Sequence, residues 1–260
     1  MAADPLPPDF VRFTVRKAEV TCVEHVADAV REALHEAHTL YRYAANHPDV
    51  RWLAGRGVVY AAPLPDDVER VVVRHNHHGG KLAPITRDLF RPPTRAPHEL
   101  LMSERLRSAQ VPTPVMLGYV LYRAPAGLQR VDVMTREVPN SFDLAVMMMS
   151  RDSAERARTW LATAEVVRTL SEAGARHHDL NVKNVLLHDR ADGQREALVI
   201  DVDRVKFGGR ESEILDANLE RLLRSARKWQ ELYGAPVTDA ELEEFASTVR
   251  DQPAALSTRS

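Results

Sequence analysis

The residues best suited to chemistry lie in the segment HHDLNVKNVLL, His177 to Leu187, and in the motif VIDVD further along the chain. They present an acid, Asp179, then an amide, Asn184, and then a second acid, Asp201. Phosphoryl transfer from ATP needs a carboxylate that orients and deprotonates an acceptor hydroxyl, and hard oxygen ligands that hold Mg²⁺ on the phosphates. Asp179 is therefore the candidate catalytic base, and Asn184 and Asp201 are the candidate metal ligands.

Residues of these types also cap turns between a helix and a strand, and either carboxylate alone would favour that structural role. The combined spacing favours a catalytic site, because His177, Asn181 and the three candidates all adjoin predicted strands. The segment resembles the catalytic loop H-R-D-L-x-x-x-N of the protein-kinase-like superfamily, and D-V-D at residues 201–203 stands where D-F-G would be. His178 replaces the loop arginine, Asp203 replaces the glycine, and no A-P-E motif follows. These departures argue against a regulated protein kinase.

The superfamily resemblance implies a nucleotide-binding first lobe with a glycine-rich flap, a basic side chain on a strand and a glutamate on the next helix. The sequence GRG at residues 55–57 is a shortened flap, so Gly55 and Gly57 are candidate nucleotide-binding residues. Arg74, in the strand VVVRH, stands where the superfamily has lysine, and Lys81 is the alternative phosphate anchor.

Glu99 is the expected partner of Arg74. Its helical neighbours place its carboxylate on the buried face of the helix, where it needs a cation unless it reaches water at the edge of that face. Alternation along the strand puts Val72 and Arg74 on one face and His75 on the other. We therefore predict that Arg74 pairs with Glu99 and contacts an ATP phosphate.

The elements that position these residues indicate an α+β protein with two lobes, the first rich in strands and the second mostly helical. We predict an N-terminal extension with a helix over 1–49, a nucleotide-binding lobe over 50–138, and a lobe over 139–260 that carries the catalytic loop, the metal ligands and the acceptor site. The predicted strands are 55–60, 68–75, 115–122 and 129–135, followed by NVLLHD and ALVIDV. The predicted helices are 23–45, HELLMSERLRSA, a helix from a capping box at Asp152 and Glu155 to Gly174, and 212–233.

Outside the catalytic loop the sequence resembles the bacterial Kdo kinases, the 3-deoxy-D-manno-octulosonic acid kinases of the lipopolysaccharide kinase group. The matching stretches are GRGVVY, VRHNHHGG, TRAPHELLMSERLRSAQVPTP, TREVPNSFDL, HHDLNVKNVLL, IDVDR and NLERLLRSARKW. The resemblance implies that ATP phosphorylates the 4-hydroxyl of Kdo on lipid A, in lipopolysaccharide inner-core biosynthesis at the cytoplasmic face of the inner membrane. An aminoglycoside or choline-type small-molecule kinase would share the loop without these stretches. A pseudokinase that serves as a binding module is favoured only by Arg74 and the short flap.

Composition limits the classes of partner. The chain of 260 residues is 44% apolar and 28% charged, and it has no apolar run near the ~18 residues that a membrane span needs. Its 35 basic and 37 acidic side chains give a net charge of −2, so we expect no nucleic-acid partner. The single cysteine, Cys22, and a start that lacks a secretion-signal pattern favour a cytoplasmic location.

Positive charge is nevertheless concentrated locally, which suits an anionic acceptor such as a sugar acid on a phosphorylated glycolipid. Between Arg74 and Arg95, five basic residues accompany one carboxylate. A second group that follows Asp201 consists of Arg204, Lys206 and Arg210. A solvated surface is the alternative for both.

Two further groups have competing interpretations. The last predicted helix carries Arg221, Arg224, Arg227 and Lys228 opposite its apolar stripe. That face suits either solvent or peripheral contact with anionic lipid headgroups. The cluster His75, His77 and His78 lacks further ligands at zinc spacing, so we expect phosphate or sugar contacts there rather than a metal.

Overall fold

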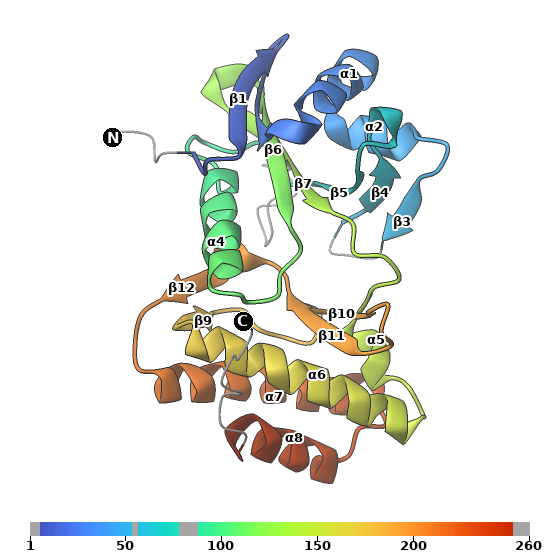
Figure 1. The fold of residues 1–260 in the computed structure, drawn as a ribbon, viewed down its shortest axis with the longest axis vertical. Coiled ribbons are helices and arrows are strands. Elements are labelled where there is room, and N and C mark those ends of the chain that lie inside the picture. Colours follow the sequence, from blue (N-terminus) through green and yellow to red (C-terminus); the bar gives the residue numbers. More distant parts are fainter. Residues whose placement is uncertain (1–5, 54–56, 78–87, 252–260) are drawn as a thin grey trace. The chain divides into compact units, whose positions relative to one another are not determined.

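The computed structural model describes residues 6–53, 57–77 and 88–251. It divides the chain into two compact units. The first unit comprises Met1–Glu104 and Val115–Glu137, and the second comprises Arg105–Pro114 and Val138–Ser260. Figure 1 shows that strands dominate the first unit and helices the second. The α+β architecture predicted from the sequence is therefore confirmed.

A seven-stranded antiparallel sheet forms the first unit, in the order β1-β2-β6-β7-β5-β4-β3. Its strands are β1 Phe10–Val15, β2 Ala18–Val23, β3 Arg51–Leu53, β4 Val59–Pro63, β5 Arg70–His75, β6 Met116–Arg123 and β7 Gln129–Arg136. The four strands expected in the first lobe correspond to β4, β5, β6 and β7. All four are confirmed, with boundaries shifted by a few residues.

The segment predicted as an N-terminal extension is part of the first unit. β1 and β2 belong to the main sheet, because β2 pairs with β6 from Ala18↔Tyr122 to Cys22↔Gly118. The expected helix over 23–45 is divided into a short 3-10 turn, α1 (Ala27–Ala37) and α2 (Leu40–Asn46). The break falls at His38, whose φ of 66° is left-handed, and Thr39 then caps α2 by accepting a hydrogen bond from the Arg42 amide.

Helices cover both faces of this sheet (Figure 1). On one face, buried residues of α1 and α2 such as Leu34 and Leu40 share a core with alternate sheet residues such as Val73. On the other face, α4 (Ala96–Ser108) packs Ala96 and Leu100 against the sheet. Burying both faces explains why a central strand such as β6, MLGYVLYR, has a near-continuous apolar sequence instead of strict alternation with polar residues.

In the described part of the second unit, small sheets lie beside helices (Figure 1). The helices are α5 Leu144–Met148, α6 Ser153–Glu172, α7 Glu211–Tyr233 and α8 Asp239–Asp251. One sheet joins β8 (Phe142–Asp143), β10 (Val185–Asp189) and β11 (Arg195–Val199), and another joins β9 (Ala175–His177) and β12 (Val205–Phe207). The predicted pair NVLLHD and ALVIDV is β10 and β11, which are antiparallel neighbours. Among the residues that the structure describes, no helix has the length and apolar character needed to cross a bilayer.

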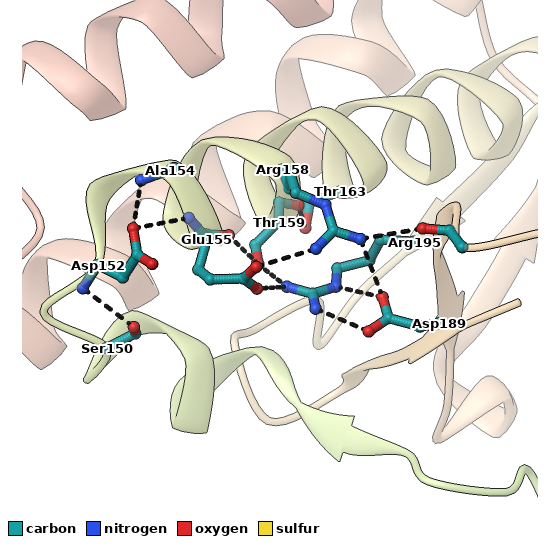
Figure 2. A network of polar contacts seen from close by, with 10 residues as sticks. Ser150, Asp152, Ala154, Glu155, Arg158, Thr159, Thr163, Asp189 and Arg195 are labelled. Atoms are coloured by element: carbon teal, nitrogen blue, oxygen red, sulfur yellow. Dashed lines mark hydrogen bonds and ion pairs between the residues drawn. The ribbon is translucent and has the colours of Figure 1, made fainter.

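The start of α6 is fixed by polar contacts that the sequence indicated (Figure 2). The Asp152 carboxylate accepts hydrogen bonds from the amides of Ala154 and Glu155, at 2.9 and 3.3 Å. Asp152 is therefore the N-cap, and Gly174, with φ of 67°, follows the helix end as predicted.

Figure 2 also shows how α6 is tied to the β10–β11 hairpin that follows the predicted catalytic loop. The guanidinium of Arg195 is 5% exposed and lies between Glu155 of α6, at 2.8 Å, and Asp189 of β10, at 2.9 Å. Its second contact with Asp189, at 3.0 Å, makes that pair bidentate. The hydrogen bond and the positive charge of Arg195 lower the pKa of Asp189. A planar, two-pronged contact of this kind fixes orientation as well as distance.

Candidate active site

His177 organises the predicted catalytic loop. Its ring is fully buried, with Nε2 3.0 Å from the carbonyl oxygen of Ile200 and Nδ1 3.2 Å from the backbone nitrogen of Asp179. A carbonyl only accepts and an amide N–H only donates, so Nε2 carries the proton and Nδ1 accepts. Burial lowers the pKa of His177, in agreement with a neutral ring. The His177 ring thereby links the backbone of Asp179 to that of Ile200, the residue before Asp201.

Two amide side chains hold the other side of Asp179. Asn181 and Asn184 both donate from Nδ2 to the Asp179 carbonyl oxygen, at 2.9 and 2.8 Å. The Asn184 side chain is nearly buried, and this contact leaves its Oδ1 as the atom that could coordinate a cation. The Asn184 carbonyl also accepts a hydrogen bond from the Ile200 amide at 3.1 Å. Asn184 and Asp201 are therefore brought to adjacent backbone positions at the ends of β10 and β11.

Asp201 has a left-handed backbone, with φ of 60° and ψ of 44°. Such a conformation is uncommon outside glycine but is tolerated by Asp, and it turns the chain sharply from β11 into a short 3-10 turn, Val202–Arg204. The donor set of one carboxylate and one amide oxygen fits Mg²⁺, which binds one or two protein carboxylates and completes its shell with substrate phosphates and water. When bound there, the ion would neutralise charge on the phosphates.

Helix α7 supports the loop through polar residues that the sequence reasoning missed. Asn218 is fully buried, accepts a hydrogen bond from the His177 amide at 2.9 Å and donates to the Ala175 carbonyl at 3.0 Å. Two turns further along the same face of α7, the Ser225 hydroxyl accepts a hydrogen bond from the Val182 amide at 3.2 Å. A buried asparagine beside the leucine stripe of α7 was the available signal, because a buried amide requires partners.

In the first unit, Arg74 and Glu99 form the predicted ion pair. Arg74 Nη2 lies 2.5 Å from Glu99 Oε1, with the two side chains 38% and 11% exposed. The ion pair between Arg74 and Glu99, predicted from the alternation of the strand and the buried face of the helix, is therefore confirmed. Of the other predicted nucleotide-binding residues, Gly55 and the alternative anchor Lys81 lie outside the described residues. Gly57 lies in an exposed bend where an added Cβ would make only an ordinary contact with His77, at 3.8 Å.

The opposite face of β5 carries a polar network that the sequence did not reveal. His75 Nδ1 lies 2.5 Å from Asp132, and His75 Nε2 lies 3.1 Å from Asp88. The carboxylate of Asp132 is fully buried and also accepts from the Tyr122 hydroxyl and the Tyr41 amide, at 2.7 and 2.9 Å. Burial alone lowers the pKa of His75, but the hydrogen bonds and charges of Asp132 and Asp88 outweigh it and raise the pKa. His75 thus has protein partners that leave no ring nitrogen for a metal, and His78 lies outside the described residues.

The segment that follows β7 begins at a residue held by two ion pairs. Glu137 is 9% exposed and pairs with Arg51 and with Arg70, whose Nε lies 2.8 Å from it. This carboxylate joins the ends of β3, β5 and β7.

The held backbone of Asp179, with Asn184 and Asp201 at neighbouring strand ends of an α+β fold, is the arrangement expected of a kinase-type phosphotransferase that acts on a hydroxyl. A model of the lipopolysaccharide kinase (Kdo/WaaP) family matches residues 49–248, and the chain belongs to that family. Use of ATP follows from membership of a kinase family.

Known relatives agree with this assignment. The 3-deoxy-D-manno-octulosonic acid kinase of Pasteurella multocida is 30% identical over 182 residues, which are 67% of this chain and 73% of the relative. The enzyme of the same name from Haemophilus influenzae is 27% identical over 181 residues, with the same shares. Among solved structures, WaaP in complex with acyl carrier protein aligns with a TM-score of 0.46 and 18% identity, over 78% of this chain and 79% of that chain.

Proposed function

We propose that this protein transfers the γ-phosphate of ATP to the 4-hydroxyl of a Kdo residue attached to lipid A. The observation that carries the proposal is the catalytic loop, in which His177, Asn181 and Asn184 hold the backbone of Asp179 on both sides. The acceptor follows from the relatives, which bear the name of Kdo kinases and match two thirds of this chain.

Each residue then has a defined task. The Asp179 carboxylate accepts the hydroxyl proton while the acceptor oxygen forms a bond to the γ-phosphorus and the bond from that phosphorus to the bridging oxygen breaks, releasing ADP. Asn184 Oδ1 and the Asp201 carboxylate would hold Mg²⁺. We assign the contact with ATP phosphate in the first unit to Arg74, which Glu99 holds in place. The glycine flap would cover the nucleotide through Gly55 and Gly57.

We further place the enzyme in the cytoplasm, in peripheral contact with the inner membrane, where a lipid-linked acceptor would be reached. Support comes from α7, whose Arg224, Arg227 and Lys228 side chains are exposed at adjacent positions. Cations on an exposed helical face attract anionic headgroups with an energy that salt reduces.

The test is acceptor-dependent transfer of radiolabelled γ-phosphate in the presence of Mg²⁺. Kdo-lipid A is compared with lipid A that lacks Kdo, with free Kdo, and with soluble aminoglycoside and choline acceptors. We expect labelling of Kdo-lipid A alone or far above the others, with the product phosphate at the 4-position by NMR. Preferred labelling of an aminoglycoside or choline would instead identify a small-molecule kinase. ATP binding without transfer to any acceptor would identify a pseudokinase.

A further inference from the structure

Two cations face each other directly in the small sheet next to the catalytic loop. The register of β9 and β12 pairs Lys206 with Arg176, between the buried pair Val205↔His177 and the pair of partly buried Phe207 with buried Ala175. Because Ala175, His177 and Val205 point inward, the alternation of the strands leaves Arg176 and Lys206 exposed on the same outer face. Like charges directly opposite each other on a strand pair destabilise it. The pairing of Arg176 with Lys206 is therefore not explained by stabilisation of the sheet, which suggests a functional role.

A third cation reaches the same place from α7. Asn218 of that helix contacts His177, and Ser225 contacts Val182 on the far side of Asp179. Arg221 lies between these two residues, one helical turn from each, so it shares the face of α7 that is turned to the catalytic loop. Its side chain is half-buried, unlike the exposed Arg224 that follows it.

No described carboxylate forms an ion pair with any of the three cations, whereas many other arginines of the second unit have one, such as Arg156 with Glu241 and Arg195 with Asp189. The half-buried His178 ring lies among them. Burial lowers the pKa of His178, and the charges of Arg176, Lys206 and Arg221 lower it further. Within the described part of the second unit, these three cations therefore have no direct carboxylate partner.

Accepting the proposed glycolipid acceptor, we propose that Arg176, Lys206 and Arg221 form a binding site for a phosphomonoester carried by that acceptor. Three cations from three elements suit a dianion better than a single carboxylate, and arginine and lysine supply the forked and the point-charge contacts that phosphate accepts. Arg176 is three residues before Asp179 in the sequence, so this site lies next to the predicted catalytic loop. A phosphate held there would fix the sugar whose hydroxyl Asp179 receives.

The kinetic test compares two acceptors, Kdo-lipid A with its phosphates and the same molecule after phosphatase treatment. For the variant Arg176→Ala/Lys206→Ala we expect the KM for the phosphorylated acceptor to rise at least about tenfold, the scale of lost charge-assisted hydrogen bonds. The KM for ATP should stay unchanged. The dephosphorylated acceptor should be a poor substrate for both proteins, with no further loss in the variant. Equal loss on both acceptors, or a changed KM for ATP, would overturn the proposal.

The control variant Arg151→Ala/Arg190→Ala removes the same charge from exposed positions of the second unit outside this cluster. It should leave both KM values as they are. If it raises the acceptor KM as much as the cluster variant does, net charge and not a site is responsible. Arg176→Lys/Lys206→Arg should restore most of the affinity, because it keeps both charges.

A second measurement does not depend on turnover, so it separates failure of this site from failure of the proposed acceptor. Inorganic phosphate is titrated into the intact protein while the His178 ring resonance is followed by NMR, with His178→Gln to identify the signal. We expect a saturable shift in the wild type and in the Arg151→Ala/Arg190→Ala control, and at least about tenfold weaker binding in Arg221→Ala. Acetate at the same concentration should bind more weakly. No phosphate response in the wild type, or acetate binding as tightly, would refute the phosphomonoester site whatever the acceptor proves to be.

Discussion

Replacing His75 by leucine tests the reasoning about the buried carboxylate of the first unit. Leucine keeps apolar volume but removes the two contacts of the ring, to Asp132 at 2.5 Å and to Asp88 at 3.1 Å. Asp88 keeps Arg130 at 2.6 Å, whereas fully buried Asp132 keeps only the Tyr122 hydroxyl and a backbone amide. Removing one partner of a fully buried pair costs about 3–5 kcal/mol, and the 13% exposure of His75 lowers the expectation to about 2–4 kcal/mol.

The effect must depend on pH with a defined sign. The folded pKa of His75 lies above its ordinary value of 6.5, so the folded unit holds the proton more tightly than the unfolded chain. The stabilisation is fully present below pH 6.5 and is lost as the pH rises through the folded pKa. The charged groups that raise this pKa are Asp132 and Asp88, and Arg130 acts on Asp88. The ring of His77 meets the ring of His75 edge-on, with 5.0 Å between the ring centroids.

Hydrogen exchange of the β5 and β7 amides measures the opening free energy of this sheet at each pH. The loss caused by His75→Leu should be greatest at pH 6 and should shrink as the pH is raised above 7. His98→Leu, which alters an exposed histidine of α4, is the control. It should change neither the opening free energy of the sheet nor the dependence of that free energy on pH. A loss that is constant with pH, or that grows at high pH, would refute the assignment of a charged His75.

Four further substitutions test the site and its support. Asp179→Asn should bind ATP normally and lose most turnover, by about a hundredfold or more, in a coupled ADP-release assay; unchanged transfer would refute the base. Asp201→Asn should weaken Mg²⁺-dependent nucleotide binding itself by calorimetry, and a normal Mg²⁺ titration would count against the ligand role. Arg74→Ala should reduce ATP affinity more than Lys81→Ala does, and the reverse order in parallel titrations would move the phosphate anchor to Lys81. Arg195→Lys should lower the urea-unfolding free energy by about 1–2 kcal/mol, since lysine cannot make the bidentate contact; no change would show that the network of Figure 2 is not stabilising.

The features that the sequence predicted correctly depend on residues that are close together in the chain or on the periodicity of a single strand or helix. The catalytic loop and the cap of α6 are short-range arrangements whose residues are close in sequence, and the Arg74–Glu99 pair follows from two periodicities, one of a strand and one of a helix. Helix α8 could have been predicted too, because Thr238 and Glu241 form a reciprocal capping box ahead of an apolar stripe.

Long-range arrangements lacked such a signal. The turn between β1 and β2 uses Arg16 with φ of 55°, so no glycine or asparagine marked a hairpin there. Asp132 occupies the middle of the apolar strand β7, and its partners Tyr41, His75 and Tyr122 come from three other elements. Only the folded sheet brings these four residues together.

His75, which is largely buried, and His177, which is fully buried, show why residue type alone could not assign these roles. Both ring nitrogens of His75 face carboxylates, so both must donate and the ring is stabilised as a cation. In His177 one nitrogen must accept from an amide, so the ring is required to be neutral. Burial lowers the pKa of both; the carboxylates reverse that effect only at His75. The first ring therefore compensates a buried charge in the sheet, and the second fixes the backbone geometry of the catalytic loop.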